Sequence, residues 1–176
     1  AMAFFVAHVP TLLTMIVVSS LMMAASMAVV GKGRRDGLGC WAAALLVNAI
    51  AHLLLMLRGQ VPDVLSVVVG NLLLSCALAG LIAAIYQFQG RPVRWLWLSV
   101  PPVLIAGLVM AFIDSFSARV GFVGLLLGLQ ATWALVAVLE RRHAIVGRGL
   151  WLLAGGLGLD ALVLGVRALL AVSMPG

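Results

Sequence analysis

Long apolar runs dominate the chain, and only short polar segments separate them. The segments read "GKGRRDG", "RGQVPD", "QGRPVR", "DSFSAR" and "ERRHAIVGR". Each apolar run is close to the roughly 20 residues that a helix needs to cross a bilayer, and none alternates polar and apolar positions as a barrel strand does. The pattern therefore predicts transmembrane helices at about residues 11–30, 38–57, 64–88, 95–113, 120–139 and 150–172.

The connections are too short to hold a further folded unit. Consecutive helices should therefore be antiparallel neighbours, and the whole of residues 1–176 should form a single domain. We expect an all-α fold, a polytopic membrane bundle of six transmembrane helices. Two adjacent prolines, Pro101 and Pro102, fall inside the fourth helix, where each removes a backbone donor, so we expect a kink or a break there.

The composition excludes a water-soluble fold. Of the 176 residues, 65% are hydrophobic and 9% are charged, against about 25% charged in soluble domains. The net charge of +6 comes from short loops rather than from a basic helix face, so we expect no nucleic-acid partner. The cysteines and histidines lack the spacing of metal or haem ligands, so we expect no metal and no cofactor.

The basic residues are distributed unequally between the two sides of the predicted bundle. Arg58 and Arg119 lie in or beside the second and fourth loops, and Arg167 lies within the sixth helix. The first, third and fifth loops hold the other eight, namely Lys32, Arg34, Arg35, Arg91, Arg94, Arg141, Arg142 and Arg148. The positive-inside rule then predicts a bacterial inner-membrane protein whose odd loops are cytoplasmic and whose N-terminus is periplasmic.

This topology bears on the two ends of the chain. The N-terminus lacks the features of a signal peptide, and both ends are abrupt, so we expect a piece of a longer protein. Six helices that begin outside also end outside. A cytoplasmic output domain would therefore require a seventh helix after residue 176.

Two opposite charges, Asp160 and Arg167, lie within the sixth apolar run. Each costs roughly 2.5–3.5 kcal/mol at the centre of a bilayer, so each needs a structural or functional reason. Two helical turns separate them by about 10.5 Å, which is too far for a direct ion pair. We expect Arg167 to extend toward the outer surface or to meet Asp63 or Asp114. A structural network and a ligand site both remain open for the pair.

Further polar residues are predicted at the outer ends of the helices. Arg58, Arg119 and Arg167 could together bind a carboxylate or phosphate, or could simply lie among lipid headgroups. His52 and Asn71 could bond between helices or line a pocket open to the outside, and Trp133 is a packing or pocket residue. The candidate ligand-binding residues are therefore Asn71, Asp160, Arg167, Arg119, His52 and Trp133. No catalytic residue is predicted.

Gly124 and Gly128 form a GxxxG motif in the fifth helix. Such a motif lets two helices approach closely. The partner helix is either a neighbour in the same chain or the same helix of a second copy, and both alternatives remain open.

The order of these features resembles the membrane input region of bacterial diguanylate cyclases, which carry a cytoplasmic GGDEF domain. The similarity covers roughly residues 10 to 172. It rests on a tryptophan and an asparagine in the second helix, on "LRGQVPD" followed by a serine and an asparagine, and on "FQGRP". It implies a further helix that leads into the cyclase, and a homodimer of the full-length protein. The chain has no GGDEF motif, so we expect it not to be an enzyme itself.

The sequence thus favours a membrane-embedded sensory domain that regulates a cyclase domain missing from this chain. Its signal would be a small or lipid-like ligand at the periplasmic half, or a partner membrane protein. The alternatives are the membrane region of a histidine kinase, a small transporter-like protein, and an anchor that only dimerises. The sequence beyond residue 176 would distinguish these classes.

Overall fold

The structure, a computed structural model, describes residues 2–33, 36–140 and 149–173. Within these ranges it is built of helices and contains no strand. In chain order the elements are α1 (Met2–Val30), α2 (Leu38–Met56), the π-helical segment η1 (Val64–Val69) that continues into α3 (Gly70–Phe88), α4 (Trp95–Ala111), α5 (Phe116–Glu140) and α6 (Gly149–Ser173). The prediction of an all-α fold is confirmed.

Five helical segments are long and apolar enough to cross a membrane, so the chain is a helical membrane protein. They are Pro10–Val30, Leu38–Met56, Val64–Phe88, Phe116–Glu140 and Gly149–Ala171. The apolar helix α4 has 17 residues, which corresponds to about 26 Å at 1.5 Å per residue. This is shorter than a typical hydrocarbon core of about 30 Å, so the predicted sixth span is present as a helix of marginal length.

Of the kink or break expected at Pro101 and Pro102, the break is absent, since α4 is continuous through both residues. Pro102 is buried, so neighbouring helices hold this turn in helical form although the backbone donors are missing. The irregular turn lies instead at Val64–Val69, where the backbone is π-helical. The sequence pattern gave no indication of it.

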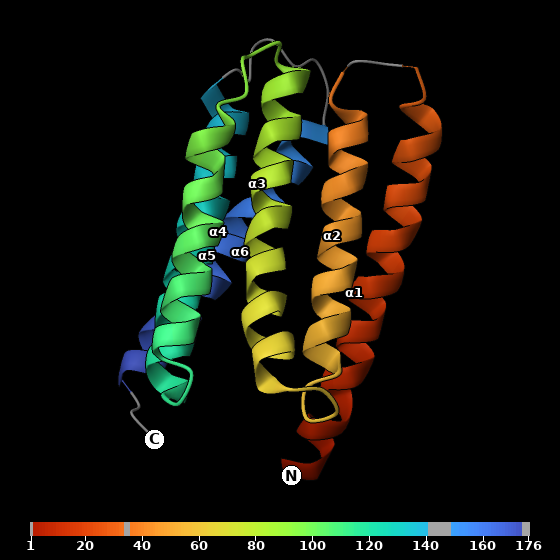
Figure 1. Cartoon of the computed structure of the whole chain (residues 1–176). Coiled ribbons are helices and arrows are strands. Elements are labelled where there is room, and N and C mark those ends of the chain that lie inside the picture. Colours follow the sequence, from red (N-terminus) through yellow and green to blue (C-terminus); the bar gives the residue numbers. More distant parts are fainter. Residues whose placement is uncertain (1, 34–35, 141–148, 174–176) are drawn as a thin grey trace.

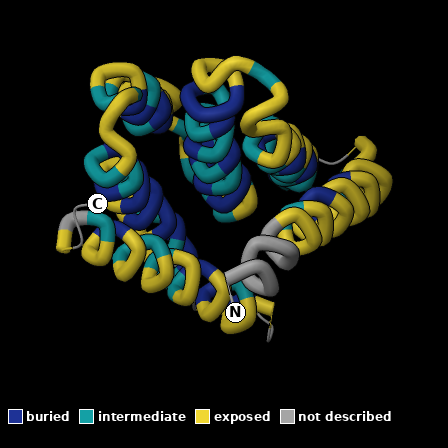
Figure 2. The backbone as a smooth tube through the Cα atoms, turned by 90° about the horizontal axis from the view of Figure 1, so that it is seen from below, coloured by how far each residue is buried: buried dark blue, intermediate teal, exposed yellow. Residues whose placement is uncertain are grey.

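The helices alternate in direction, and both termini lie at the lower end of the bundle in Figure 1. Successive helices α1, α2 and α3 pack side by side, α3 also packs against α4 and α5, and α5 packs against α6. Among the described residues, α1 packs only against α2, and α6 packs only against α5. Figure 2 shows that the buried residues line the inward faces, and that most of the described surface of α1 is exposed.

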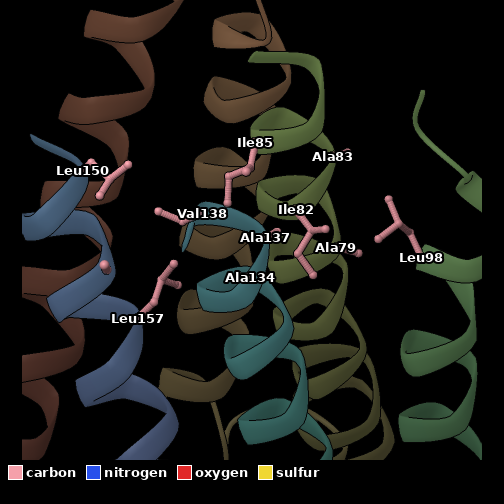
Figure 3. Close-up of a cluster of buried hydrophobic side chains, with 11 residues drawn as sticks. Ala79, Ile82, Ala83, Ile85, Leu98, Ala134, Ala137, Val138, Leu150 and Leu157 are labelled. Carbon is pink, nitrogen blue, oxygen red and sulfur yellow. The ribbon is translucent and has the colours of Figure 1, made fainter. Parts of the chain in front are cut away.

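Small and branched side chains form the core. One cluster in the upper half joins α3, α4, α5 and α6 through residues such as Ile82, Leu98 and Val138 (Figure 3). A second cluster includes Val67, Ile105 and Val123. Many of the fully buried positions are alanines, which let helix backbones approach closely where lipid removes the hydrophobic drive for association.

The GxxxG motif brings α5 and α6 together. A Cβ atom at Gly124 would lie 3.1 Å from the carbonyl oxygen of Leu164, and one at Gly128 would lie 3.6 Å from the Cβ of Leu164. Gly124 and Gly128 are therefore part of a contact within the chain, which is one of the two alternatives that the sequence left open.

The upper end carries a polar network around the connection from α3 to α4. Arg91 forms an ion pair of 2.5 Å with Glu140, and its guanidinium lies 4.3 Å from the centre of the Tyr86 ring. The side chain of Gln89 donates to the carbonyl of Ala137 at 2.7 Å. These contacts fix the end of α5 to the loop that follows α3.

Candidate ligand-binding cavity

A cavity of about 350 Å³ lies in the lower half of the bundle, between α2 and α3 on one side and α5 and α6 on the other. One residue of α1, Leu13, also borders it. The polar side chains of its wall come from four helices and one loop, and they are Asn48, His52, Arg58, Asn71, Arg119, Asp160 and Arg167. Five of the six candidate residues chosen from the sequence therefore line the same cavity.

The wall formed by α2 and α3 presents an imidazole and two amides. Nδ1 of His52 lies 2.8 Å from the carbonyl oxygen of Asn48. Because a carbonyl oxygen only accepts, Nδ1 carries a proton, and Nε2 is left for a further bond. The Asn48 amide donates to the hydroxyl of Ser20 on α1 at 3.1 Å, so α1 is tied to this wall.

Asn71 is positioned by the irregular start of the third span. Its side-chain amide donates to the carbonyl of Val67 at 2.7 Å, and Val67 lies in the π-helical segment η1. The bond occupies one N–H and leaves the amide oxygen of Asn71 as an acceptor. π-Helical turns are frequent at functional sites, and here one lies directly beside the cavity.

Two arginines share one aromatic ring at the lower end of the cavity. The guanidinium carbon of Arg119 lies 5.7 Å from the centre of the Phe116 ring, and that of Arg58 lies 6.0 Å from it. Both distances fit cation–π interactions. Arg119 is buried, with 8% of its surface exposed, and it donates to the carbonyl of Ile113 at 2.5 Å.

The third arginine, Arg167, borders the cavity from α6 and is exposed. The ion pairs expected with Asp63 or Asp114 do not form, and within the described part of the chain no carboxylate lies within ion-pair distance of Arg58, Arg119 or Arg167. Asp63 and Asp114 are both exposed, so water or lipid headgroups can solvate them without a partner. The three guanidiniums remain available to an anion.

Asp160 lies farther along α6 and is exposed on the cavity side of the helix. It makes no hydrogen bond or ion pair to any described residue. With His52 neutral, three arginines and one aspartate leave a formal excess of two positive charges around the cavity. The arrangement therefore favours an anionic ligand.

Trp133 is the one candidate residue that the structure does not bring to this cavity. Its indole N–H donates to the hydroxyl of Tyr86 at 2.9 Å, and its ring packs against the buried cluster of the upper half. Each polar group thus satisfies the other inside the bundle, which is a packing role.

Two residues that the sequence reasoning did not select have clear structural roles. Phe116 joins Arg58 and Arg119. Gln130 donates to the carbonyl of Ser75 at 3.2 Å and accepts from its hydroxyl at 2.6 Å, which links α5 to α3. A glutamine inside an apolar run could have been selected from the sequence, because polar side chains are rare there. Phe116 could not, because it resembles any aromatic residue at a helix end.

The fold and the cavity define a class, a polytopic helical membrane protein with a cationic cavity at one end. Comparison with protein-family models, with curated proteins and with solved structures finds no match to this chain.

Proposed function

We propose that this chain is a membrane-embedded signal-input domain that regulates a cytoplasmic diguanylate cyclase domain located outside this sequence. The observation that supports it is the convergence of Arg58, Arg119 and Arg167, with His52 and Asp160, on one cavity. Ionisable side chains are expensive in a membrane bundle and mark functional sites there. The resemblance of the helix pattern to the membrane input regions of diguanylate cyclases indicates which output domain we expect.

The packing of the helices suggests how a ligand would act. Arg167 lies on α6, which packs only against α5 among the described helices, whereas His52 and Asn71 lie on α2 and α3. A ligand that contacts both walls draws α6 toward α2. It shifts the population only if it binds that arrangement better than the open one. Because α6 is the last helix in the described part of the chain, its movement would pass to a segment that follows it.

In this proposal the chain lies in the bacterial inner membrane with a periplasmic N-terminus, and the cavity opens toward the periplasm. The positive-inside rule supports this orientation. Lys32, Arg91 and Arg94 lie in the loops of the end opposite the cavity. The full-length protein acts as a homodimer, because a diguanylate cyclase joins two GTP molecules held by two domains.

The first test is the reading frame after residue 176. We expect one more transmembrane helix followed by a GGDEF domain. The second test measures cyclic di-GMP in cells that express the full-length protein with Arg167→Gln, and we expect a several-fold change in output. Arg94→Gln is the control, since Arg94 is exposed and lines neither this cavity nor the two that adjoin it.

A stop codon shortly after residue 176 contradicts the proposal. A histidine kinase core after residue 176 would show that the output domain is a kinase and not a cyclase. Equal cyclic di-GMP output from the Arg167→Gln and unchanged proteins excludes the cavity as the sensory site. The substrate sites of transporters are typically formed by discontinuous helices. The helix α4, in which the sequence predicted a kink or a break, is continuous, which favours the sensory proposal over a transporter.

A further inference from the structure

The cationic cavity continues into an apolar groove along the same side of the bundle. It shares Asn48, Leu78 and Asp160 with a second cavity of about 360 Å³. The second cavity shares Trp41 and Leu153 with a third of about 390 Å³, which reaches Asp36 and Gly149 near the upper end. The three cavities therefore adjoin one another in a row, and we call this row the groove. It is bordered by α2 and α6 for most of its length.

The chemistry of the groove changes along its length. All the arginines that border it lie in the lowest cavity. The middle cavity is lined by leucines, alanines, Trp41 and Gly156, with Asn48 and Asp160 only at its border with the lowest one. A molecule that fits both parts has an anionic group at one end and a long apolar part behind it.

No contact between α1 and α6 closes the groove, because these helices do not pack against each other in the described parts of the chain. The lowest cavity is bordered by Leu13 of α1 and by Asp160, Leu164 and Arg167 of α6. A lipid can therefore enter sideways without leaving the membrane.

The geometry points to an anionic phospholipid of the surrounding bilayer as the ligand of this site. Its phosphate is held by Arg58, Arg119 and Arg167, and an acyl chain lies in the groove between α2 and α6. The biological role of lipid binding rests on the proposed function, in which the bound lipid is the signal. Guanidinium groups bind phosphate in pairs of parallel hydrogen bonds, and acyl burial against leucines provides the rest of the affinity.

Asp160 sets the direction of the lipid in the groove. It lies two helical turns, about 10.5 Å, from Arg167 along α6. Its carboxylate repels a phosphate that moves deeper, whereas an uncharged acyl chain can pass it. The headgroup is therefore held at the arginines.

The binding test uses the whole chain in a neutral detergent and native mass spectrometry. Phosphatidylglycerol is compared with phosphatidylcholine of the same acyl chains, and inorganic phosphate is the soluble probe. We expect one phosphatidylglycerol molecule to bind at least about tenfold more tightly than phosphatidylcholine. Both lipids carry the phosphate, but the ammonium of choline adds a positive charge beside the three arginines, and such like-charge contacts weaken binding. Equal binding of the two lipids overturns the proposal. Tighter binding of inorganic phosphate than of the lipid identifies a site for a soluble anion instead.

Arginine variants test the headgroup site. Arg167→Gln should weaken phosphatidylglycerol binding by about tenfold, the effect of losing a hydrogen bond to a charged group. Because Arg167 is exposed, the variant should fold. Arg119→Gln should act in the same direction, but Arg119 is buried and its loss can also unfold the bundle. Arg94→Gln is the control and should bind as the unchanged chain does. Equal loss in Arg167→Gln and Arg94→Gln overturns the assignment.

Two neighbouring glycines of α6 test the groove. A Cβ atom at Gly155 or at Gly156 would meet nothing within 4 Å, but only Gly156 lines the groove. Gly156→Leu should block the acyl chain and weaken phosphatidylglycerol binding several-fold, while inorganic phosphate binding is unchanged. Gly155→Leu is the matched control and should have no effect. Equal effects of the two substitutions exclude the groove as the acyl site.

Binding to the chain alone does not depend on an output domain. Selective phosphatidylglycerol binding without a GGDEF domain beyond residue 176 leaves the lipid site standing and overturns the proposed function. A GGDEF domain beyond residue 176, together with equal binding of the two lipids, supports the proposed function and overturns the lipid site.

Discussion

Arg119 shows how a single charged side chain is accommodated in this bundle. It is the one buried arginine among the described residues, yet it has no carboxylate partner there. The carbonyl of Ile113 and the face of the Phe116 ring provide partial negative charge, which stabilises the guanidinium without neutralising it. The residue therefore keeps its positive charge for an anion in the cavity.

Gly37 is a residue-scale test of the close packing at the upper end. It has a φ of +86°, and an added Cβ would lie 2.6 Å from the carbonyl oxygen of Ala84. Gly33 has a φ of +82° with nothing within 4 Å. A side chain in the left-handed region costs roughly 1–2 kcal/mol in both, so any difference reports the contact with Ala84.

We therefore expect Gly37→Ala to lower the thermal unfolding midpoint in detergent by clearly more than Gly33→Ala. The measurement is a thiol-reactive dye assay or circular dichroism at matched detergent concentration. If the two substitutions lower the midpoint equally, the first loop does not pack against α3 at Gly37.

The helices themselves were largely predictable from sequence. Five of the six predicted spans are helices long enough to cross a membrane. Most of their ends follow from apolar runs and polar breaks, because each helix must satisfy its own backbone in lipid, but α1 begins at Met2 rather than at about residue 11. The shortness of α4, its continuity through Pro101 and Pro102 and the π-helical start at Val64 were not predictable. Each depends on how neighbouring helices pack against that turn, which leaves no periodic signal in the chain.

The contact between α5 and α6 provides the prediction at the scale of elements. A Cβ at Gly124 would press on the backbone of α6 at Leu164, whereas a Cβ at Gly165 of α6 would meet nothing within 4 Å. Gly124→Val should therefore lower the thermal unfolding midpoint, and should weaken lipid binding because it displaces Arg167 relative to α5. Gly165→Val carries the same β-branched penalty in a helix and is the control.

Both variants are measured by thermal unfolding and by phosphatidylglycerol binding. Equal midpoints for Gly124→Val and Gly165→Val would show that α5 and α6 are not held together at this glycine. Unfolding of Gly124→Val with unchanged lipid affinity would show that the position of α6 does not control the site.

At the scale of the whole molecule, the candidate site depends on two groups of helices that are joined incompletely. The chain α1, α2 and α3 forms one wall, and α5 with α6 forms the other. The sequence placed Arg58, Arg119 and Arg167 at the same level of the membrane, but it could not show that they border the same space. That convergence follows from the packing of α3 against α5.

The orientation of the molecule gives the last prediction. In a variant with Cys40→Ala and Cys76→Ala, a membrane-impermeant thiol reagent should label Gln60→Cys in intact cells, because Gln60 is exposed in the loop at the cavity end. Pro92→Cys, exposed at the opposite end, should be labelled only after lysis. The reverse pattern would place the cavity toward the cytoplasm and overturn the proposed signal path.

The sequence by itself determined that this is a helical membrane protein, approximately where most of its helices lie, and which ionisable residues fall inside apolar runs, where they are costly. These properties depend on local composition and on the length of apolar runs, because bilayer thickness sets the length of a span and lipid penalises charged side chains. Only the tertiary structure decided that five candidate residues share one cavity, that Trp133 packs elsewhere, and that an apolar groove leads away from the arginines. Such features arise from the relative rotation of helices far apart in the chain, and no single apolar run contains that information.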